Sequence, residues 1–292
     1  MRVGIHVPVF GPLANADNII AVARRVEALG FDSVWSSDHV VMPARVESRY
    51  PYSATGQFLV PPDSTWFDPL IALAAVASVT ARVRLGTSVV IVPYRNPIVL
   101  AKMVSSLDCV CHGRLILGCG AGWLKEEFDA LGVPHRERGG RMDEALDIMR
   151  ILWRDGAGTF NGRFYRFSDM HLNPKPVQKP GPPCWIGGSS DAALRRVLRR
   201  GDGWHPTRVT PEDFRIRLAV LREMAAREGR DLGRIALCPK TSYDRCRDLE
   251  TFMAFKQAGA TDILIDFLTD KLDDLYRGLD AMAHDILPRV RE

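Results

Sequence analysis

Apolar residues in the middle of the chain switch between two kinds of spacing. Val83–Val92 is a short, mainly apolar run rich in β-branched residues, which predicts a buried strand. Ile98–Cys109 repeats its apolar residues at helical spacing, after Pro97, a residue favoured in the first turn of a helix. Leu115–Leu117 is a second buried strand, separated from that helix by Gly113. The pattern predicts a strand–helix–strand unit with parallel strands.

The same alternation runs from one end of the chain to the other. Eight apolar strands are each followed by an amphipathic helix, which predicts a single α/β domain over residues 1–292, a closed (β/α)8 TIM barrel. A doubly wound open sheet is the alternative, because one sequence does not show closure. The predicted strands are Val3–Val9, Phe31–Trp35, Val83–Val92, Leu115–Leu117, Cys184–Ile186, Gly203–His205, Ile235–Cys238 and Asp262–Phe267. The predicted helices are Asn18–Leu29 (capped by Asp17), Asp68–Thr80, Ile98–Cys109, Arg141–Arg154, Asp191–Arg200, Pro211–Arg227, Leu249–Gln257 and Lys271–Arg291.

Two long stretches lack a helical or strand pattern and read as insertions, one after the second strand and one before the fifth. Val40–Ser64 is polar and proline-bearing, and a loop of this length in a compact domain is usually functional. Gly156–Pro183 predicts a small hairpin followed by a proline-rich segment. Both carry aromatic residues, so we expect both to line the mouth of a pocket. An apolar or cyclic carbonyl compound is the substrate that this lining favours.

Composition and charge narrow the possible partners. The 292 residues are 46% hydrophobic and 25% charged, with a net charge of +4 and no dense basic block, which argues against nucleic acid binding. No apolar run is long enough for a membrane span, and Met1 leads directly into a strand, so we expect a cytoplasmic protein. The six cysteines form no CxxC pair, which predicts reduced, buried thiols and no metal site.

Polar residues at strand ends are the candidates for chemistry, because ligands bind at the carboxyl ends of parallel strands. Asp38 and His39 follow the second strand; a histidine there can exchange protons near neutral pH, or the pair can simply cap backbone groups. Gly187, Gly188 and Ser189 precede a helix, where free amides bind phosphate, although an ordinary helix cap is the alternative.

A third group of candidates is the glycine series Gly118, Gly120 and Gly122. Its last glycine comes one residue early for a dinucleotide fingerprint, so a Rossmann site is rejected. Tight packing and direct ligand contact remain open for these glycines. Arginines 195, 196, 199 and 200 on the helix after Ser189 are interpreted as a solvated face. His205 is interpreted as a pocket-lining residue, and His6 as a core or pocket residue.

Several motifs, in this order and spacing, resemble the luciferase-like monooxygenase superfamily over nearly the whole chain. They are Val34–His39, Leu85–Val89, Gly118–Trp123, Gly162–Tyr165, Ile186–Ser189 and Gly201–Trp204. The resemblance is greatest to the branch that uses coenzyme F-420, a 5-deazaflavin, and a neighbouring branch uses FMN. Trp123 stands where the sugar-phosphate dehydrogenases of the F-420 branch have an acidic residue, which argues against a sugar phosphate substrate.

The resemblance implies roles for individual residues. Asp38 would contact the deazaflavin, and His39 would be the catalytic acid or base. Thr87, Ser88 and Val89 would form a bulge with a non-proline cis peptide after Ser88, which presses on the back of the cofactor ring. The glycines of the Gly118–Gly122 and Gly187–Ser189 segments would complete the cofactor site.

The function implied is hydride transfer between F-420 and a small organic substrate. The alternatives are an FMN-dependent monooxygenase and a non-catalytic flavin-binding protein of the same fold. A homodimer is also implied, paired through helices beside the early strands. Leu70–Val79 and Ile98–Leu107 are apolar over more of their surface than contact with one barrel requires.

Overall fold

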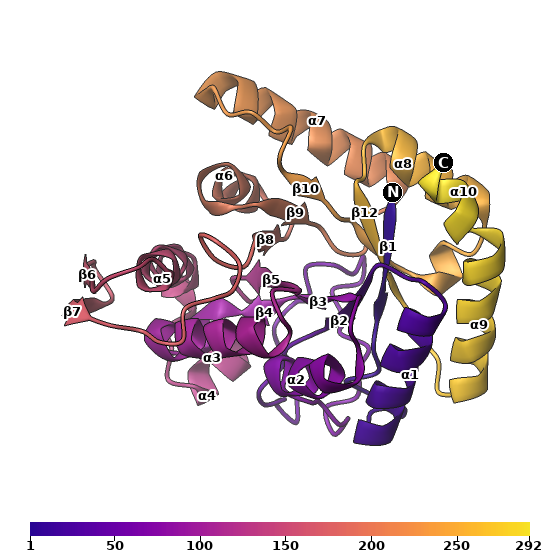
Figure 1. Ribbon diagram of the computed structural model, residues 1–292, viewed down its shortest axis with the longest axis horizontal. Helices are drawn as coiled ribbons and strands as arrows, with labels where there is room; N and C mark the ends of the chain where they lie inside the picture. Colours follow the sequence, from indigo (N-terminus) through magenta and orange to yellow (C-terminus); the bar gives the residue numbers. More distant parts are fainter.

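The computed structural model describes residues 1–292, and its parallel strands form a ring with helices around the outside (Figure 1). The strands are β1 (Arg2–His6), β2 (Ser33–Ser36), β3 (Arg84–Thr87), β4 (Val90–Ile91), β5 (Leu115–Gly120), β6 (Gly158–Asn161), β7 (Arg166–Met170), β8 (Cys184–Gly187), β9 (Gly203–His205), β10 (Ala236–Leu237), β11 (Lys240–Ser242) and β12 (Asp262–Asp266). The helices are α1 (Ala16–Ala28), α2 (Pro69–Val79), α3 (Pro97–Val110), α4 (Lys125–Ala130), α5 (Arg138–Trp153), α6 (Asp191–Arg200), α7 (Pro211–Glu228), α8 (Leu249–Ala258), α9 (Leu272–Asp285) and α10 (Leu287–Arg291). Short 3-10 turns lie at η1 (Val92–Tyr94), η2 (His135–Glu137) and η3 (Tyr243–Arg245).

The pairing of the seventh strand closes the barrel. This strand is divided at Pro239: β10 pairs with β9, and β11 pairs with β12, which in turn pairs with β1. Pro239 has no N–H to donate, while its carbonyl accepts from the Leu264 amide at 2.9 Å. The predicted closed barrel is therefore confirmed, and the open sheet is excluded. The seventh strand extends beyond its predicted end at Cys238.

The predicted strand Val83–Val92 is also divided in two. β3 pairs with β2 and with the start of β5, and β4 pairs with the end of β5. Between them lies a cis peptide bond joining Ser88 and Val89, as the resemblance implied. The bend allows one strand of the ring to contact β5 at two separate places.

The barrel interior is filled by large side chains that require glycine at the paired position of the neighbouring strand. Trp35 in β2 and Trp185 in β8 belong to a buried cluster with Ile116 in β5, Leu264 in β12 and Cys238, which lies between β10 and β11. A β-carbon at Gly86 would lie 2.3 Å from the Trp35 ring, and one at Gly203 would lie 2.5 Å from the Trp185 ring. A larger cluster of 60 buried residues packs the strands against the outer helices. The barrel is therefore a packed core, and space for a ligand exists only at its ends.

The helices follow the predicted positions with small shifts at their ends. Helix α1 is capped by Asn15, whose side chain accepts from the Asn18 amide, so the predicted cap at Asp17 is wrong. Helix α2 has Asp68 as its cap and proline at its first position, as does α3 with Asn96. The two termini lie side by side, and the Met1 ammonium donates to the Val290 carbonyl at 2.7 Å.

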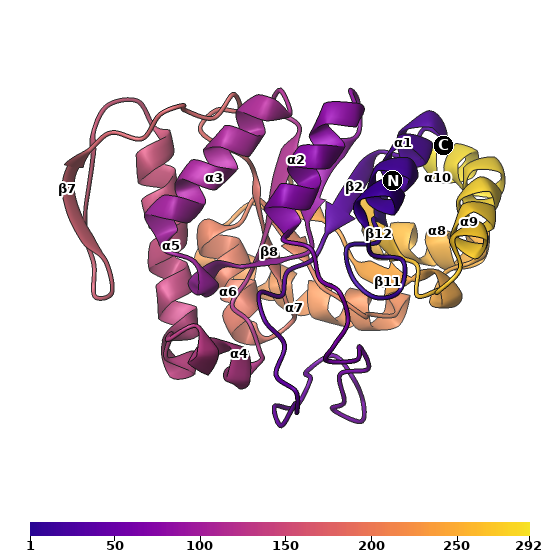
Figure 2. The same cartoon turned by 90° about the horizontal axis from the view of Figure 1, so that it is seen from below.

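The segment Gly156–Pro183 contains the predicted hairpin, β6 and β7, but it does not line the pocket mouth. The Glu144 carboxylate on α5 accepts from the amides of Arg163, Phe164 and Tyr165, and this holds the hairpin against the outside of the barrel. In Figure 2 the hairpin stands at the left edge, away from the loop after β2. The expectation that this insertion lines the pocket is wrong, because its contact with α5 holds it elsewhere. That contact involves a residue outside the insertion, so the sequence of the insertion does not indicate it.

No helix combines the length and apolar character needed to cross a membrane. All six cysteines are free thiols, and five of them are buried.

Candidate active site

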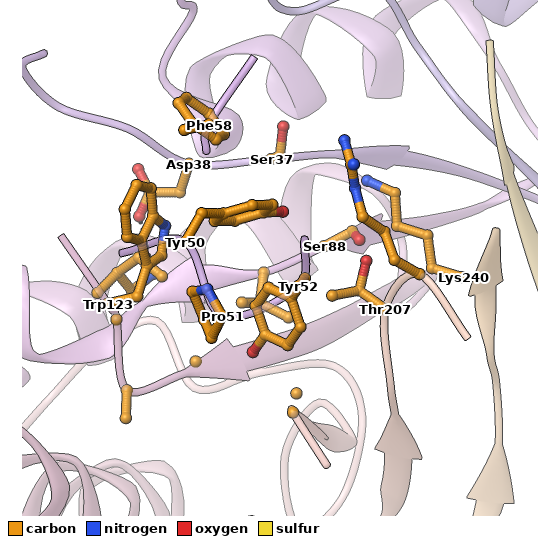
Figure 3. Close-up of a pocket in the computed structure, with 18 of the residues that line it drawn as sticks. Ser37, Asp38, Tyr50, Pro51, Tyr52, Phe58, Ser88, Trp123, Thr207 and Lys240 are labelled. Atoms are coloured by element: carbon orange, nitrogen blue, oxygen red, sulfur yellow. Dashed lines mark hydrogen bonds between the residues drawn. The ribbon is translucent and has the colours of Figure 1, made fainter. Parts of the chain in front are cut away.

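A cavity of about 1240 Å³ opens at the carboxyl ends of the barrel strands. Residues that follow β1, β2, β3, β5, β8, β9, β11 and β12 line it, together with the loop after β2. Figure 3 shows Tyr50, Pro51 and Tyr52 of that loop reaching over the strand ends between Trp123 and Thr207. The loop Val40–Ser64 therefore lines the pocket mouth as expected, and its position is the usual place for chemistry in such barrels.

His205 forms part of the cavity floor and is fixed in one tautomer. Its Nδ1 lies 2.7 Å from the Cys238 carbonyl, which can only accept, so Nδ1 carries the proton. Its Nε2 therefore accepts from the Ser88 hydroxyl at 2.9 Å. The imidazole stacks on Trp35, with 5.1 Å between ring centroids. Burial lowers the pKa of His205 to about 4, so the ring is neutral at physiological pH.

The back wall of the cavity is built around Val89. A β-carbon at Gly120 would lie 2.4 Å from a methyl group of Val89, and one at Gly187 would lie 3.1 Å from the other. Ser88, Val89, Gly120, Gly122 and Gly187 all line the cavity. Gly120 and Gly187 make room for Val89 between the ends of β5 and β8, and Gly122 makes room for Phe128 and Ile91. Because these three positions carry no side chain, the wall is flat enough to face a planar ring.

Two of the predicted cofactor contacts need correction. Thr87 and Gly118 are buried below the cavity and do not line it. The Thr87 hydroxyl donates to the Gly118 carbonyl at 2.8 Å, and a β-carbon at Gly118 would lie 1.8 Å from the Thr87 carbonyl oxygen. Gly118 therefore serves the close approach of β3 and β5, which is the packing alternative.

Asp38 borders the cavity, but its side chain is fully buried and its carboxylate is occupied by other groups of the protein. Arg95 donates to both Asp38 oxygens, at 2.6 and 3.0 Å, and the Ile91 amide donates to one of them at 2.9 Å. Burial lowers the pKa of Arg95, but its bonds to Asp38 and Asp68 outweigh this and raise the pKa above its usual value. The carboxylate thus ties the end of β2 to η1, and its implied contact with the cofactor stays a prediction.

His39 lines the cavity as well, among aromatic side chains. Its ring is surrounded by Phe58, Trp66 and Trp123, with centroid distances of 5.5, 4.6 and 6.3 Å. Its Nδ1 lies 2.8 Å from the Glu127 carboxylate, and its Nε2 forms no hydrogen bond within the protein. A histidine with one nitrogen held and the other free toward an aromatic-lined cavity can exchange a proton with a bound substrate.

Glu127 is the residue that sequence reasoning missed. It lies in the first turn of α4 and is fully buried. The available signal was an acidic residue at an inward-facing position of a short helix, beside Phe128. Its partner His39 is 88 residues away, so only the tertiary structure brings the two together.

The segment Gly187–Ser190 approaches the N-terminus of α6. Ser190 caps this helix by accepting from the Ala193 amide, while Gly187, Gly188 and Ser189 line the cavity. Arg196 is only 10% exposed, pairs with Asp143 at 2.7 Å and also lines the cavity, so its interpretation as a solvated residue is wrong. Arg199 and Arg200 form ion pairs on the outer side of the helix.

Positive charge predominates around the cavity. Eight cationic side chains line it against three carboxylates, of which Asp38 and Asp266 are already paired with Arg95 and Lys240. The cations are Arg49, Lys125, Arg136, Arg138, Arg196, Arg208, Lys240 and Arg245. This excess favours an anionic ligand.

Comparison with known proteins identifies the family of this chain. The model of the luciferase-like monooxygenase family matches residues 1–243. The chain belongs to this family. The F-420-dependent glucose-6-phosphate dehydrogenase of Kineococcus radiotolerans is 33% identical over 219 residues, which cover 73% of this chain and 59% of that protein.

Two solved structures show how widely the fold of this luciferase-like chain is shared. An F-420-dependent secondary alcohol dehydrogenase, in complex with an F-420–acetone adduct, superposes with a TM-score of 0.79 and 18% identity. The superposition covers 100% of this chain and 99% of the dehydrogenase chain. The oxygenating constituent of 3,6-diketocamphane monooxygenase from Pseudomonas putida, in complex with FMN, gives a TM-score of 0.75 at 17% identity, with 99% and 98% coverage.

The buried histidines make stability depend on pH. Burial lowers the pKa of His6 to about 3 and that of His205 to about 4, whereas both titrate near 6.5 in an unfolded chain. Below pH 6.5 the unfolded state therefore binds protons that the folded state excludes. The free energy of unfolding should fall between pH 7 and 5, approaching about 1.4 kcal/mol per pH unit for each histidine. Urea titrations should show a shallower pH slope for His205→Gln, and the slope should be unchanged for His284→Gln, an exposed control.

The Asp38–Arg95 pair predicts a second stability effect. Asp38→Asn leaves the largely buried Arg95 without its main partner and should lower the free energy of unfolding by about 3–5 kcal/mol. Asp68→Asn should cost less, because Asp68 is 35% exposed and Arg95 keeps Asp38. Urea denaturation of both variants provides the measurement. Equal losses in the two variants would contradict the role of Asp38 as the main partner of Arg95. A stable Asp38→Asn protein with much weaker cofactor binding would instead support a contact between Asp38 and the cofactor.

Proposed function

We propose that the chain is a cytoplasmic oxidoreductase that binds F-420 non-covalently and transfers hydride between this cofactor and a small organic substrate. The position of His39 is the observation that carries the proposal. Its free Nε2 lies in an aromatic-walled cavity whose back wall contains Ser88 and Val89. The kinship with an F-420-dependent dehydrogenase supports the choice of cofactor.

The residues around the cavity fit such a cofactor. The flat wall at Val89, Gly120 and Gly187 would hold the planar ring, and the segment Gly187–Ser189 would hold its phosphate. The excess of cavity-lining cations would compensate for an anionic cofactor tail. When bound, the cofactor supplies the hydride chemistry, and the protein supplies orientation and exclusion of water.

His39 would manage the proton that accompanies hydride transfer. With Nδ1 held by Glu127, Nε2 is the nitrogen available to a substrate oxygen. The neutral ring would accept a proton from an alcohol, and the charged ring would donate one to a carbonyl compound. The rings of Phe58, Trp66 and Trp123 would exclude water from this exchange and favour an apolar substrate.

An FMN-dependent monooxygenase is the second candidate. The shared fold with an FMN-dependent oxygenating enzyme supports it, because the same flat wall would accommodate a flavin ring. It would require reduced flavin and oxygen in place of F-420. A non-catalytic flavin-binding protein is the candidate from another class, although such a protein would have no use for a free Nε2 among aromatic rings.

Titration of the purified protein with each cofactor separates these functions. We expect F-420 to bind at least about tenfold more tightly than FMN, a difference of about 1.4 kcal/mol. Fluorescence of the deazaflavin and of the flavin provides the measurement. Tight FMN binding without F-420 binding would rule out the proposed cofactor. Binding of F-420 without turnover of any alcohol, aldehyde or enone would favour the non-catalytic protein.

We also propose that the chain forms a homodimer through α2 and α3. These helices lie side by side in Figure 2, and no other helix covers their outer faces. Ile71 is 64% exposed and Val99 is 54% exposed, so a second copy would remove apolar surface from water.

Light scattering at micromolar concentration should give a dimer for the wild type. Ile71→Asp combined with Val99→Asp should give a monomer, whereas Ile216→Asp, at an exposed site on α7, should leave a dimer. A monomeric wild type would contradict this assembly.

A further inference from the structure

Two adjacent carboxylates at the start of α4 hold the loop that follows β2. Glu126 accepts from the amides of Glu47 and Ser48, at 2.6 and 2.8 Å, and from the Ser48 hydroxyl at 2.5 Å. Glu127 accepts from the amides of Val40 and Val41, at 2.6 and 3.2 Å. Both residues thus anchor the same loop, but only Glu127 also contacts His39.

The hydrogen bonds around Glu127 assign each of its oxygens. The amides of Val40 and Val41 both reach Oε1, and an amide can only donate. The Tyr94 hydroxyl and the His39 Nδ1 both reach Oε2, at 2.9 and 2.8 Å. Burial and the Glu127 charge raise the pKa of Tyr94, so its hydroxyl stays protonated and remains a donor. A carboxylate that accepts from all four groups needs no proton of its own.

We propose that Glu127 is the positioning residue for His39, an inference that rests on the proposed function. It holds the Nδ1–H tautomer, so the lone pair of the neutral ring is on Nε2 and faces the cavity. Because its other oxygen holds the backbone of the next two residues, Glu127 also fixes the main chain from which the ring projects. Orientation and tautomer therefore depend on one fully buried group.

Glu127→Gln should move the His39 proton from Nδ1 to Nε2, while the side chain at position 127 keeps its shape. The two loop amides require an oxygen at the Oε1 position, so the side-chain NH2 must take the place of Oε2. There it would donate to Nδ1 of His39, and the imidazole proton would move to Nε2. The neutral ring would then present a hydrogen to the substrate in place of a lone pair.

Glu126→Gln is the matched control. The two residues are neighbours on one helical turn, carry the same side chain and bind backbone amides of the same loop. Glu126 makes no contact with His39, so its loss tests loop anchoring alone. A role for Glu127 that is only structural predicts similar behaviour of the two variants.

Nitrogen NMR of isotope-labelled histidine reads the tautomer directly, with the His39 signal identified by its loss in His39→Ala. We expect a protonated Nδ1 in the wild type and in Glu126→Gln, and a protonated Nε2 in Glu127→Gln. Turnover of F-420-dependent reactions should fall about 10²–10⁴-fold in Glu127→Gln, with an altered pH profile. Cofactor affinity in both variants, and turnover in Glu126→Gln, should stay within about twofold of the wild type.

Three results would overturn the role of Glu127. One is a wild-type His39 that carries its proton on Nε2, which needs no variant and is readable even if Glu127→Gln fails to fold. Another is an unchanged tautomer in a folded Glu127→Gln protein. The third is an equal loss of turnover in the two glutamine variants. Absence of F-420 turnover in the wild type would contradict the proposed function but not the role of Glu127, because the tautomer is measured without cofactor.

Discussion

The packing of the barrel interior determines where this protein can bind a ligand. Trp35 and Trp185 fill the ring of strands, and they fit because Gly86 and Gly203 leave no side chain in their way. A filled barrel has no internal space, so polar groups gather at its carboxyl end. The Trp35 ring also forms the surface on which His205 stacks, and His205 in turn holds the Ser88 hydroxyl. The floor of the cavity is thus continuous with the hydrophobic core.

Above this floor, the neighbouring residues Asp38 and His39 have separate roles, because each is held by a different partner. The Asp38 side chain is fully buried and binds Arg95, whereas His39 lies among aromatic rings at the cavity. Each depends on a buried ionic or hydrogen-bonded partner from another element, Arg95 after η1 and Glu127 in α4. The end of β2 is therefore held from two sides, and the direction of His39 is fixed by the contacts of both residues.

Local sequence was sufficient to predict the strands, the helices and the ends of the strands where ligand-binding residues gather. Apolar runs marked the eight strands, and proline and cap residues marked the starts of α2 and α3. Resemblance to a family, and not periodicity, supplied the cis peptide after Ser88. Partners far apart in the chain remained hidden: nothing near Asp38 indicates Arg95, and nothing near His39 indicates Glu127.

The insertion Gly156–Pro183 is a second case in which the local sequence did not predict a long-range contact. Its aromatic residues suggested a pocket wall, but Glu144 directs the hairpin outward through three backbone amides. Aromatic composition predicts burial, and it does not predict against which surface a side chain is buried. The loop after β2 has a similar composition and lies over the cavity, because Glu126 and Glu127 bind its backbone at Ser48 and Val40.

Charge and shape select different parts of a ligand in this cavity. The aromatic rings around His39 offer no charge to a substrate, and the one titratable group there is held in a single orientation. His205 on the floor is kept neutral by burial, so it adds no charge either. The cations lie in β11, on the segments after β5, β8, β9 and β11, and on the loop after β2. Lys125, Arg196 and Lys240 pair with Asp129, Asp143 and Asp266, and the other five cations form no ion pair with a carboxylate. An anionic cofactor would relieve this repulsion and contribute binding energy far from the reacting atoms. The aromatic pocket can then accept a neutral substrate, whose orientation depends on shape and on one hydrogen bond to His39.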